Sequence, residues 1–366
     1  MSILQRISPP RLLAGAVRRV GSIFQLGNAE SPLLAFERIL GKPGMRPLPD
    51  RSLHPDLAQA PRLETLEEFR DLVKALRQER GREEIPGGNP VLILVHGIFD
   101  RVYGAAFSPL LVWGDLLERL QAKYGNRVYG YDHETLALGP LENARDLISR
   151  LPAHTEIEIL CHSRGGLVVR ALLQHPECQA SLRARQIKIR NVVFMGAANH
   201  GSPLAEPGKT DELLTMFTHL FHARAPAEGP AAHLKLIVQT VRVLGRRAAD
   251  LPGIAALRPD SKLIRGLSSA VLPDGVRCTF VRANFGNAVD NRLQEPEGIS
   301  DSVFGSTLND LVVPFEGMTK MGGVSPTDGQ IVTLDNAGTP QGDFYHLNYL
   351  DSSKVRERIV RDLIGS

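Results

Sequence analysis

The sequence of 366 residues has few cysteines and no long apolar run. Its three cysteines, Cys161, Cys178 and Cys278, are odd in number and include no C-x-x-C pair, which argues against a disulfide framework or a zinc knuckle. No apolar run reaches the roughly 18 residues that a membrane-spanning helix needs. A chain of this length can bury a large core without a disulfide or a metal, so we expect an ordinary globular protein.

The chain also has little net charge. Its 43 lysines and arginines stand against 40 acidic residues, and a difference of +3 is too small to indicate a groove for nucleic acid. The N-terminus lacks an uninterrupted apolar segment with a following A-x-A site, so we expect no secretory signal and a cytoplasmic protein.

The first 89 residues are predicted to form a helical extension and a connector. Residues 1–24 contain four arginines and no acidic residue, and their apolar side chains recur at helical spacing. Such a helix either packs its apolar face on the main domain or makes a peripheral contact with a membrane or a protein. A proline-containing connector follows over residues 43–61, and residues 62–82 read as a mixed-charge amphipathic helix.

From residue 90 the pattern is typical of an α/β protein. Apolar runs predict buried strands, and helical patterns lie between them; the strands are expected at 91–96, 127–131, 157–161, 191–196 and 277–283, and the helices at 109–122, 140–151 and 164–174. This alternation implies a mostly parallel central sheet flanked by helices. We therefore expect one catalytic domain over residues 90–366.

A candidate nucleophile follows the predicted strand 157–161. The segment CHSRGG, residues 161–166, leads directly into a helix, as in the nucleophile elbow G-x-S-x-G, with Cys161 in place of the first glycine. The elbow would raise Ser163 above the sheet at a helix N-terminus. The alternative is that Ser163 merely caps the helix.

Backbone donors for an oxyanion are expected at two places. The segment His96-Gly97-Ile98-Phe99 follows the strand 91–96, where an α/β hydrolase completes its oxyanion hole. The predicted donors are the N–H groups of Ile98 and of Arg164, the residue after the serine.

A base and an acid should follow the serine in the order Ser, Asp or Glu, His. His346 lies after every predicted strand and before a C-terminal helix at 352–364, so it is the predicted base. Asp310, in the segment NDLVVP, is the predicted acid, with Asp301 and Asp335 as alternatives. His162 is adjacent to the serine on a sharp turn and should point away. The stretch 284–309 has no assigned role.

A helical cap is expected over about residues 204–270. Helices at 211–221 and 234–244 each place apolar side chains on one face, and Leu213 and Phe217, together with Phe99, are the predicted substrate-binding residues. The alternative is that both helices are buried permanently on the sheet. The cap carries nine basic and six acidic residues, which suits either an anionic lipid surface or a solvated basic face.

Six segments together resemble those of bacterial lipases and esterases of the α/β-hydrolase superfamily, and of the related GPI-inositol-deacylase type of hydrolase. They are VHGIF, CHSRGGLVVR, MGAANHGSPLA, LPGIAALRPDS, NDLVVP and YHLNYL. The resemblance covers about residues 90–364. It implies an α/β-hydrolase fold with a cap and no cofactor or metal. It also implies Ser163 as nucleophile, Asp310 as acid, His346 as base, and Ile98 and Arg164 as oxyanion donors.

Three functions remain open at this point. The first is a serine hydrolase of carboxylic esters, with a small-molecule or lipid ester as substrate. The second is an amidase, peptidase or thioesterase that uses the same three residues, because the sequence does not distinguish leaving groups. The third is a non-catalytic binding or scaffold protein on a hydrolase fold.

Overall fold

The computed structural model describes residues 44–47, 85, 88, 90–102, 106–107, 115–125, 127–224, 245–286, 291–335 and 344–365. The helices expected within residues 1–24, 62–82 and 234–244 lie outside the described residues. So do residues 108–114, the start of the helix expected at 109–122. No helix in the described part of the chain is long and apolar enough to cross a membrane.

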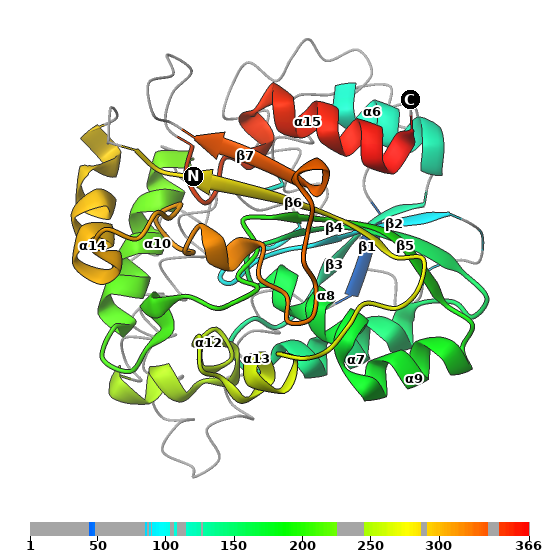
Figure 1. Cartoon of the computed structure of the whole chain (residues 1–366), viewed down its shortest axis with the longest axis horizontal. Coiled ribbons are helices and arrows are strands. Elements are labelled where there is room, and N and C mark those ends of the chain that lie inside the picture. Colours follow the sequence, from blue (N-terminus) through cyan, green and yellow to red (C-terminus); the bar gives the residue numbers. More distant parts are fainter. Residues whose placement is uncertain are drawn as a thin grey trace, which may run out of the picture.

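A seven-stranded sheet forms the centre of the protein (Figure 1). Its order is β1-β3-β2-β4-β5-β6-β7, and every neighbouring pair is parallel except β1 and β3. The strands are β1 (Gly44–Pro47), β2 (Val91–Val95), β3 (Val128–Asp132), β4 (Glu156–His162), β5 (Lys188–Met195), β6 (Arg277–Asn284) and β7 (Ile331–Asp335). The five strands expected from apolar runs are present, because strands covered by helices on both faces of a sheet are rich in apolar residues.

Two strands were not expected from the sequence. β7 alternates buried and half-exposed residues, a weaker signal than a continuous apolar run. β1 lies within the segment interpreted as a proline-containing connector, and it pairs with β3 from Gly44↔Asp132 to Pro47↔Tyr129. Part of the N-terminal extension is therefore an edge strand of the central sheet.

Helices cover both faces of the sheet (Figure 1). On one face, side chains of α6 and α15 pack against β2, β6 and β7, and on the other, side chains of α7, α8 and α9 pack against β2, β4 and β5. These helices are α6 (Asp115–Tyr124), α7 (Pro140–Arg150), α8 (Gly165–Gln174), α9 (Pro176–Ala184) and α15 (Ser353–Ile359), which continues as a π-helix over Val360–Ile364.

A third apolar cluster covers the carboxyl ends of the strands. It is built from α10 (Thr210–Arg224), α12 (Pro252–Ala255) and α13 (Lys262–Gly266), which lie between β5 and β6, and from α14 (Gln294–Phe304), between β6 and β7. In Figure 1, α10 and α14 lie together at one end of the sheet. The parallel sheet, the helices on both faces and this helical layer make up the expected α/β-hydrolase fold.

Candidate active site

Ser163 occupies the sharp turn between β4 and α8. Its φ of +56° lies in the left-handed region of the backbone. Residues other than glycine rarely adopt this conformation, and surrounding contacts must stabilise it. The Ser163 N–H donates to the Met195 carbonyl at 3.1 Å, and the Ser163 carbonyl accepts from the N–H groups of Gly166 and Ala198 at 2.9 and 3.1 Å. These three backbone bonds stabilise the strained turn and fix the direction of the Ser163 side chain.

Two glycines after Ser163 permit the close approach of helix and sheet. A Cβ on Gly165 would lie 2.4 Å from the Val95 carbonyl oxygen, and a Cβ on Gly166 would lie 2.5 Å from the Cβ of Ala197. Cys161, which stands where the elbow motif has its first glycine, is fully buried, and its thiol contacts the Val193 carbonyl oxygen at 3.6 Å. The sheet therefore accommodates a cysteine here, while both glycines on the helix side are required.

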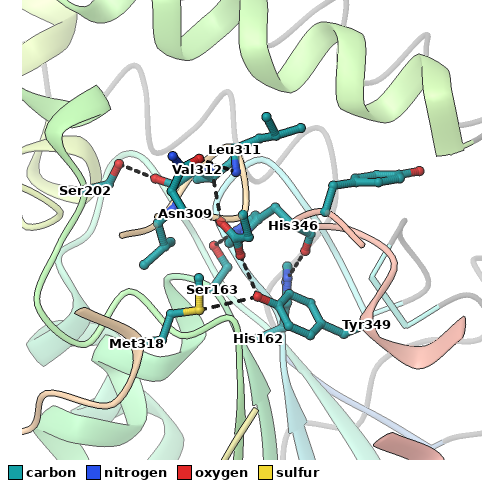
Figure 2. A network of polar contacts seen from close by, with 12 residues as sticks. His162, Ser163, Ser202, Asn309, Leu311, Val312, Met318, His346 and Tyr349 are labelled. Carbon is teal, nitrogen blue, oxygen red and sulfur yellow. Dashed lines mark hydrogen bonds and ion pairs between the residues drawn. The ribbon is translucent and has the colours of Figure 1, made fainter. Parts of the chain in front are cut away.

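The structure brings Ser163, His346 and Asp310 together. Figure 2 labels Ser163 and His346 within this network of polar contacts. His346 Nδ1 lies 2.7 Å from Asp310 Oδ2, and His346 Nε2 lies 2.7 Å from Ser163 Oγ. With the ring proton on Nδ1 facing the carboxylate, Nε2 is left to accept the hydroxyl proton of Ser163. The His346 N–H also donates to the Asp310 carbonyl at 3.0 Å, so the two residues are joined through backbone and side chain.

Asp310 is held in a tight turn. Its Oδ1 accepts from the N–H groups of Val312 and Val313 at 3.1 and 2.8 Å, and Leu311 adopts a φ of +78°. Asn309 Oδ1 accepts from the Leu311 N–H at 2.8 Å and from the Ser300 hydroxyl at 2.9 Å. Ser300 belongs to α14, so the stretch 284–309, which had no assigned role, contains a helix that supports this turn. Asp301 and Asp335, the alternative acids, lie exposed, whereas Asp310 is fully buried and contacts His346.

Two further side chains, those of His162 and Tyr349, join this group of residues, and neither was assigned to the site from the sequence. His162 Nε2 lies 2.6 Å from the His346 carbonyl oxygen, to which it donates. Burial holds the pKa of His162 well below its usual range, so the ring is neutral. The hydroxyl of Tyr349 donates to Asp310 Oδ2 at 2.7 Å. Tyr349 is part of the quoted segment YHLNYL, but its spacing of three from His346 carries no motif.

The end of β2 passes directly beside Ser163. A Cβ on Gly97 would lie 2.7 Å from the Ser163 Cβ and 3.1 Å from its Oγ. His96 Nδ1 donates to the Gly97 carbonyl at 2.9 Å, and the His133 N–H donates to His96 Nε2 at 3.2 Å. In a trans peptide the C=O and the following N–H point in opposite directions, so this bond fixes the orientation of the Ile98 N–H. Burial lowers the pKa of His96 to about 4, which keeps it neutral for this role.

Arg164, whose N–H is the second predicted oxyanion donor, is fully buried at the start of α8. Its guanidinium donates to the Leu138 carbonyl at 2.6 Å and to Asn143 Oδ1 at 3.0 Å. The side chain therefore ties the beginning of α8 to α7 and to the loop before it.

The predicted substrate-binding residues meet in the apolar cluster that covers the site. The ring of Phe99 packs edge-on against Phe217 of α10 at 5.1 Å, and Phe217 packs edge-on against the His346 ring at 6.1 Å. Leu213 is buried in the same cluster. Ser163 is only 2% exposed and His346 is fully buried, so these apolar groups enclose the reactive side chains.

Within the described residues, no group of three or more His, Cys, Asp and Glu side chains is arranged to hold a metal ion. The Ser163 hydroxyl lies beside the imidazole of His346, the carboxylate of Asp310 and backbone N–H groups. Such a set can perform nucleophilic and general acid–base steps.

Several solved structures are similar to this chain. Lipase 1 from Pelosinus fermentans is 12% identical, with 75% of this chain and 99% of that chain covered and a TM-score of 0.49. EstA from Clostridium botulinum is 14% identical, with 91% and 97% covered and a TM-score of 0.49. The Staphylococcus hyicus lipase is 10% identical, with 76% and 93% covered and a TM-score of 0.44.

A search of the curated proteins gave no match. One family does match the sequence, over residues 58–364, a range that includes Ser163, Asp310 and His346 and extends over more than half of the chain. The chain belongs to this family, which is described as Domain of unknown function (DUF7379).

Proposed function

We propose that this protein is a serine hydrolase that cleaves carboxylic esters with apolar acyl groups. The observation that carries the proposal is the buried chain of 2.7 Å contacts from Ser163 Oγ through the His346 ring to Asp310 Oδ2. The order of these residues along the chain, serine, then aspartate, then histidine, is that of α/β hydrolases.

In the proposed reaction, Ser163 is the nucleophile and His346 is the base. His346 Nε2 takes the hydroxyl proton as Oγ attacks the ester carbonyl, and Asp310 stabilises the imidazolium that forms. The imidazolium then gives its proton to the departing alkoxide, which leaves an acyl-enzyme. Water, deprotonated by His346, attacks this intermediate and releases the acid and the free serine.

The oxyanion would be bound by the N–H groups of Ile98 and Arg164. Two observations support this assignment: Gly97 packs directly against Ser163, and Arg164 opens α8. The N-terminus of a helix also favours negative charge. Loss of one such donor typically lowers the rate by about two to three orders of magnitude.

The apolar cluster around Phe99, Leu213 and Phe217 supports an apolar acyl group as the substrate. Because Ser163 is almost fully buried, a shift of α10 away from His346 would open a path for the substrate. The binding energy of an acyl chain against these side chains would offset the loss of their mutual contacts.

The proposal is tested with Ser163→Ala and a fluorophosphonate probe. We expect the wild-type protein to be labelled and to hydrolyse p-nitrophenyl esters, and the variant to do neither. Ser149→Ala, a change at an exposed serine of α7, is the matched control and should keep both activities. Labelling of the Ser163→Ala protein at the wild-type rate would refute the assignment of the nucleophile.

A substrate panel then defines the leaving group and the acyl chain. Acyl esters of increasing length, with and without a lipid interface, are compared with the matching amides and thioesters. We expect esters of medium or long chain to have the highest kcat/KM. Faster turnover of the amide or the thioester would replace the ester proposal.

A further inference from the structure

Tyr349 contacts the same carboxylate oxygen as His346. It lies in the short helix η8 (Tyr349–Asp351), and its hydroxyl is 2.7 Å from Asp310 Oδ2, which also accepts from His346 Nδ1 at 2.7 Å (Figure 2). The other oxygen, Oδ1, accepts two backbone N–H groups, those of Val312 and Val313. Within the described residues, the carboxylate therefore accepts from two backbone N–H groups and from two side chains, the imidazole of His346 and the hydroxyl of Tyr349.

The ring of Tyr349 is fixed from several sides. Gly196, at a φ of +50°, packs against it so closely that a Cβ there would lie 2.5 Å from the ring Cε2. Met318 Sδ lies 3.5 Å from the hydroxyl oxygen. Burial and the charge of Asp310 raise the pKa of the phenol well above its usual value of 10, so its proton is retained at every pH of an enzyme assay.

We propose that Tyr349 is a positioning residue for the reaction, which acts on His346 through Asp310. This inference rests on the proposed function. The phenol holds Oδ2 in line with His346 Nδ1 and draws part of the negative charge of the carboxylate towards itself. Both effects keep the shared proton on Nδ1, which leaves Nε2 as an acceptor for the Ser163 hydroxyl.

The test is Tyr349→Phe, which removes only the hydroxyl from a ring that remains packed. One hydrogen bond to a charged group is lost, so we expect kcat/KM to fall about tenfold. Without the phenol, more of the negative charge of Asp310 acts on the imidazolium, so the acid limb of the kcat/KM profile should move to higher pH by about half a unit. The downfield proton NMR signal of His346 Nδ1–H in the resting protein should shift as well.

Tyr124→Phe is the matched control. Tyr124 is also a buried tyrosine whose hydroxyl contacts a carboxylate, that of Glu158, but it lies in α6 and away from Ser163. We expect this variant to lose stability with no change in the acid limb or in the downfield signal. Its thermal unfolding measures the cost of deleting a buried phenol elsewhere in the fold.

Two results would overturn the inference. One is a Tyr349→Phe protein with the wild-type kcat/KM and acid limb. The other is a loss of activity that only matches the loss of stability, with the acid limb and the downfield signal unmoved. Both differ from a failure of the proposed function, in which the wild-type protein itself is neither labelled by the fluorophosphonate nor active on esters.

Discussion

Asp310→Asn should reduce turnover by about four orders of magnitude while the fold is retained. In the wild type, Oδ1 accepts two backbone N–H groups and Oδ2 accepts the protons of His346 and Tyr349. The asparagine has only one oxygen. If it stays with the two backbone donors, the NH₂ group faces the imidazole and the phenol.

The NH₂ group in that position reverses the tautomer of His346. Nδ1 must then accept a hydrogen bond from the amide, so the ring proton moves to Nε2, which can no longer accept from Ser163. The corresponding exchange in a serine protease lowers kcat about 10⁴-fold, equivalent to about 5.5 kcal/mol of transition-state stabilisation. The two backbone donors determine how the amide lies, so we expect the same reversal of the tautomer and a loss of similar size here.

The assay measures kcat for a short p-nitrophenyl ester and the rate of fluorophosphonate labelling. Asp146→Asn is the control, because Asp146 also accepts from a tyrosine, Tyr131 at 2.7 Å, but lies in α7. We expect the control to keep most of its activity. A decrease of less than tenfold in the Asp310→Asn protein would refute the assignment of Asp310 as the acid.

Three further outcomes are expected. Gly165→Ala should destabilise the fold by about 3 kcal/mol or prevent folding, because the added Cβ would lie 2.4 Å from the backbone oxygen of Val95. A urea unfolding curve that matches that of the wild type would contradict this prediction. Burial lowers the pKa of His96 to about 4, so below pH 6.5 the unfolded chain binds more protons than the folded one. The free energy of unfolding should therefore fall by roughly 3 kcal/mol between pH 7 and pH 4 because of this residue. His96→Asn should flatten that pH dependence in urea titrations. Phe217→Ala should lower the kcat/KM ratio of long over short acyl esters several-fold, because a long acyl chain loses an apolar contact that a short one does not make, and an unchanged ratio would argue against an acyl site at α10.

The parts of the fold that the sequence predicted are those with strong local signals. β2 is a continuous apolar run, β4 is apolar from Ile157 to Cys161 except for Glu158, and the turn at Ser163 is specified by the glycines that follow it. β1 could not be predicted, because a four-residue edge strand beside a proline has neither a clear apolar period nor the composition of a buried strand. Its place in the sheet is determined by its pairing with β3, a segment that lies about eighty residues further along the chain.

The candidate site divides in the same way. The sequence identifies Ser163, Asp310 and His346 because each follows a strand or precedes a helix, in a fixed order along the chain. This order has structural meaning because the carboxyl ends of parallel strands lie at the same edge of the sheet. No comparable sequence pattern predicts the contacts that support these three residues. Ser300 stabilises the turn of Asp310 through Asn309, and Tyr349 reaches the Asp310 carboxylate from the short helix η8 after His346.

These supporting contacts depend on packing between elements distant in sequence. Gly196, at the end of β5, leaves room for the Tyr349 ring only because it lacks a side chain. Any larger residue there would displace the phenol from Asp310 without changing one residue of the predicted motif. The distance between the reactive groups is therefore determined as much by the size of residues outside the motif as by the motif itself.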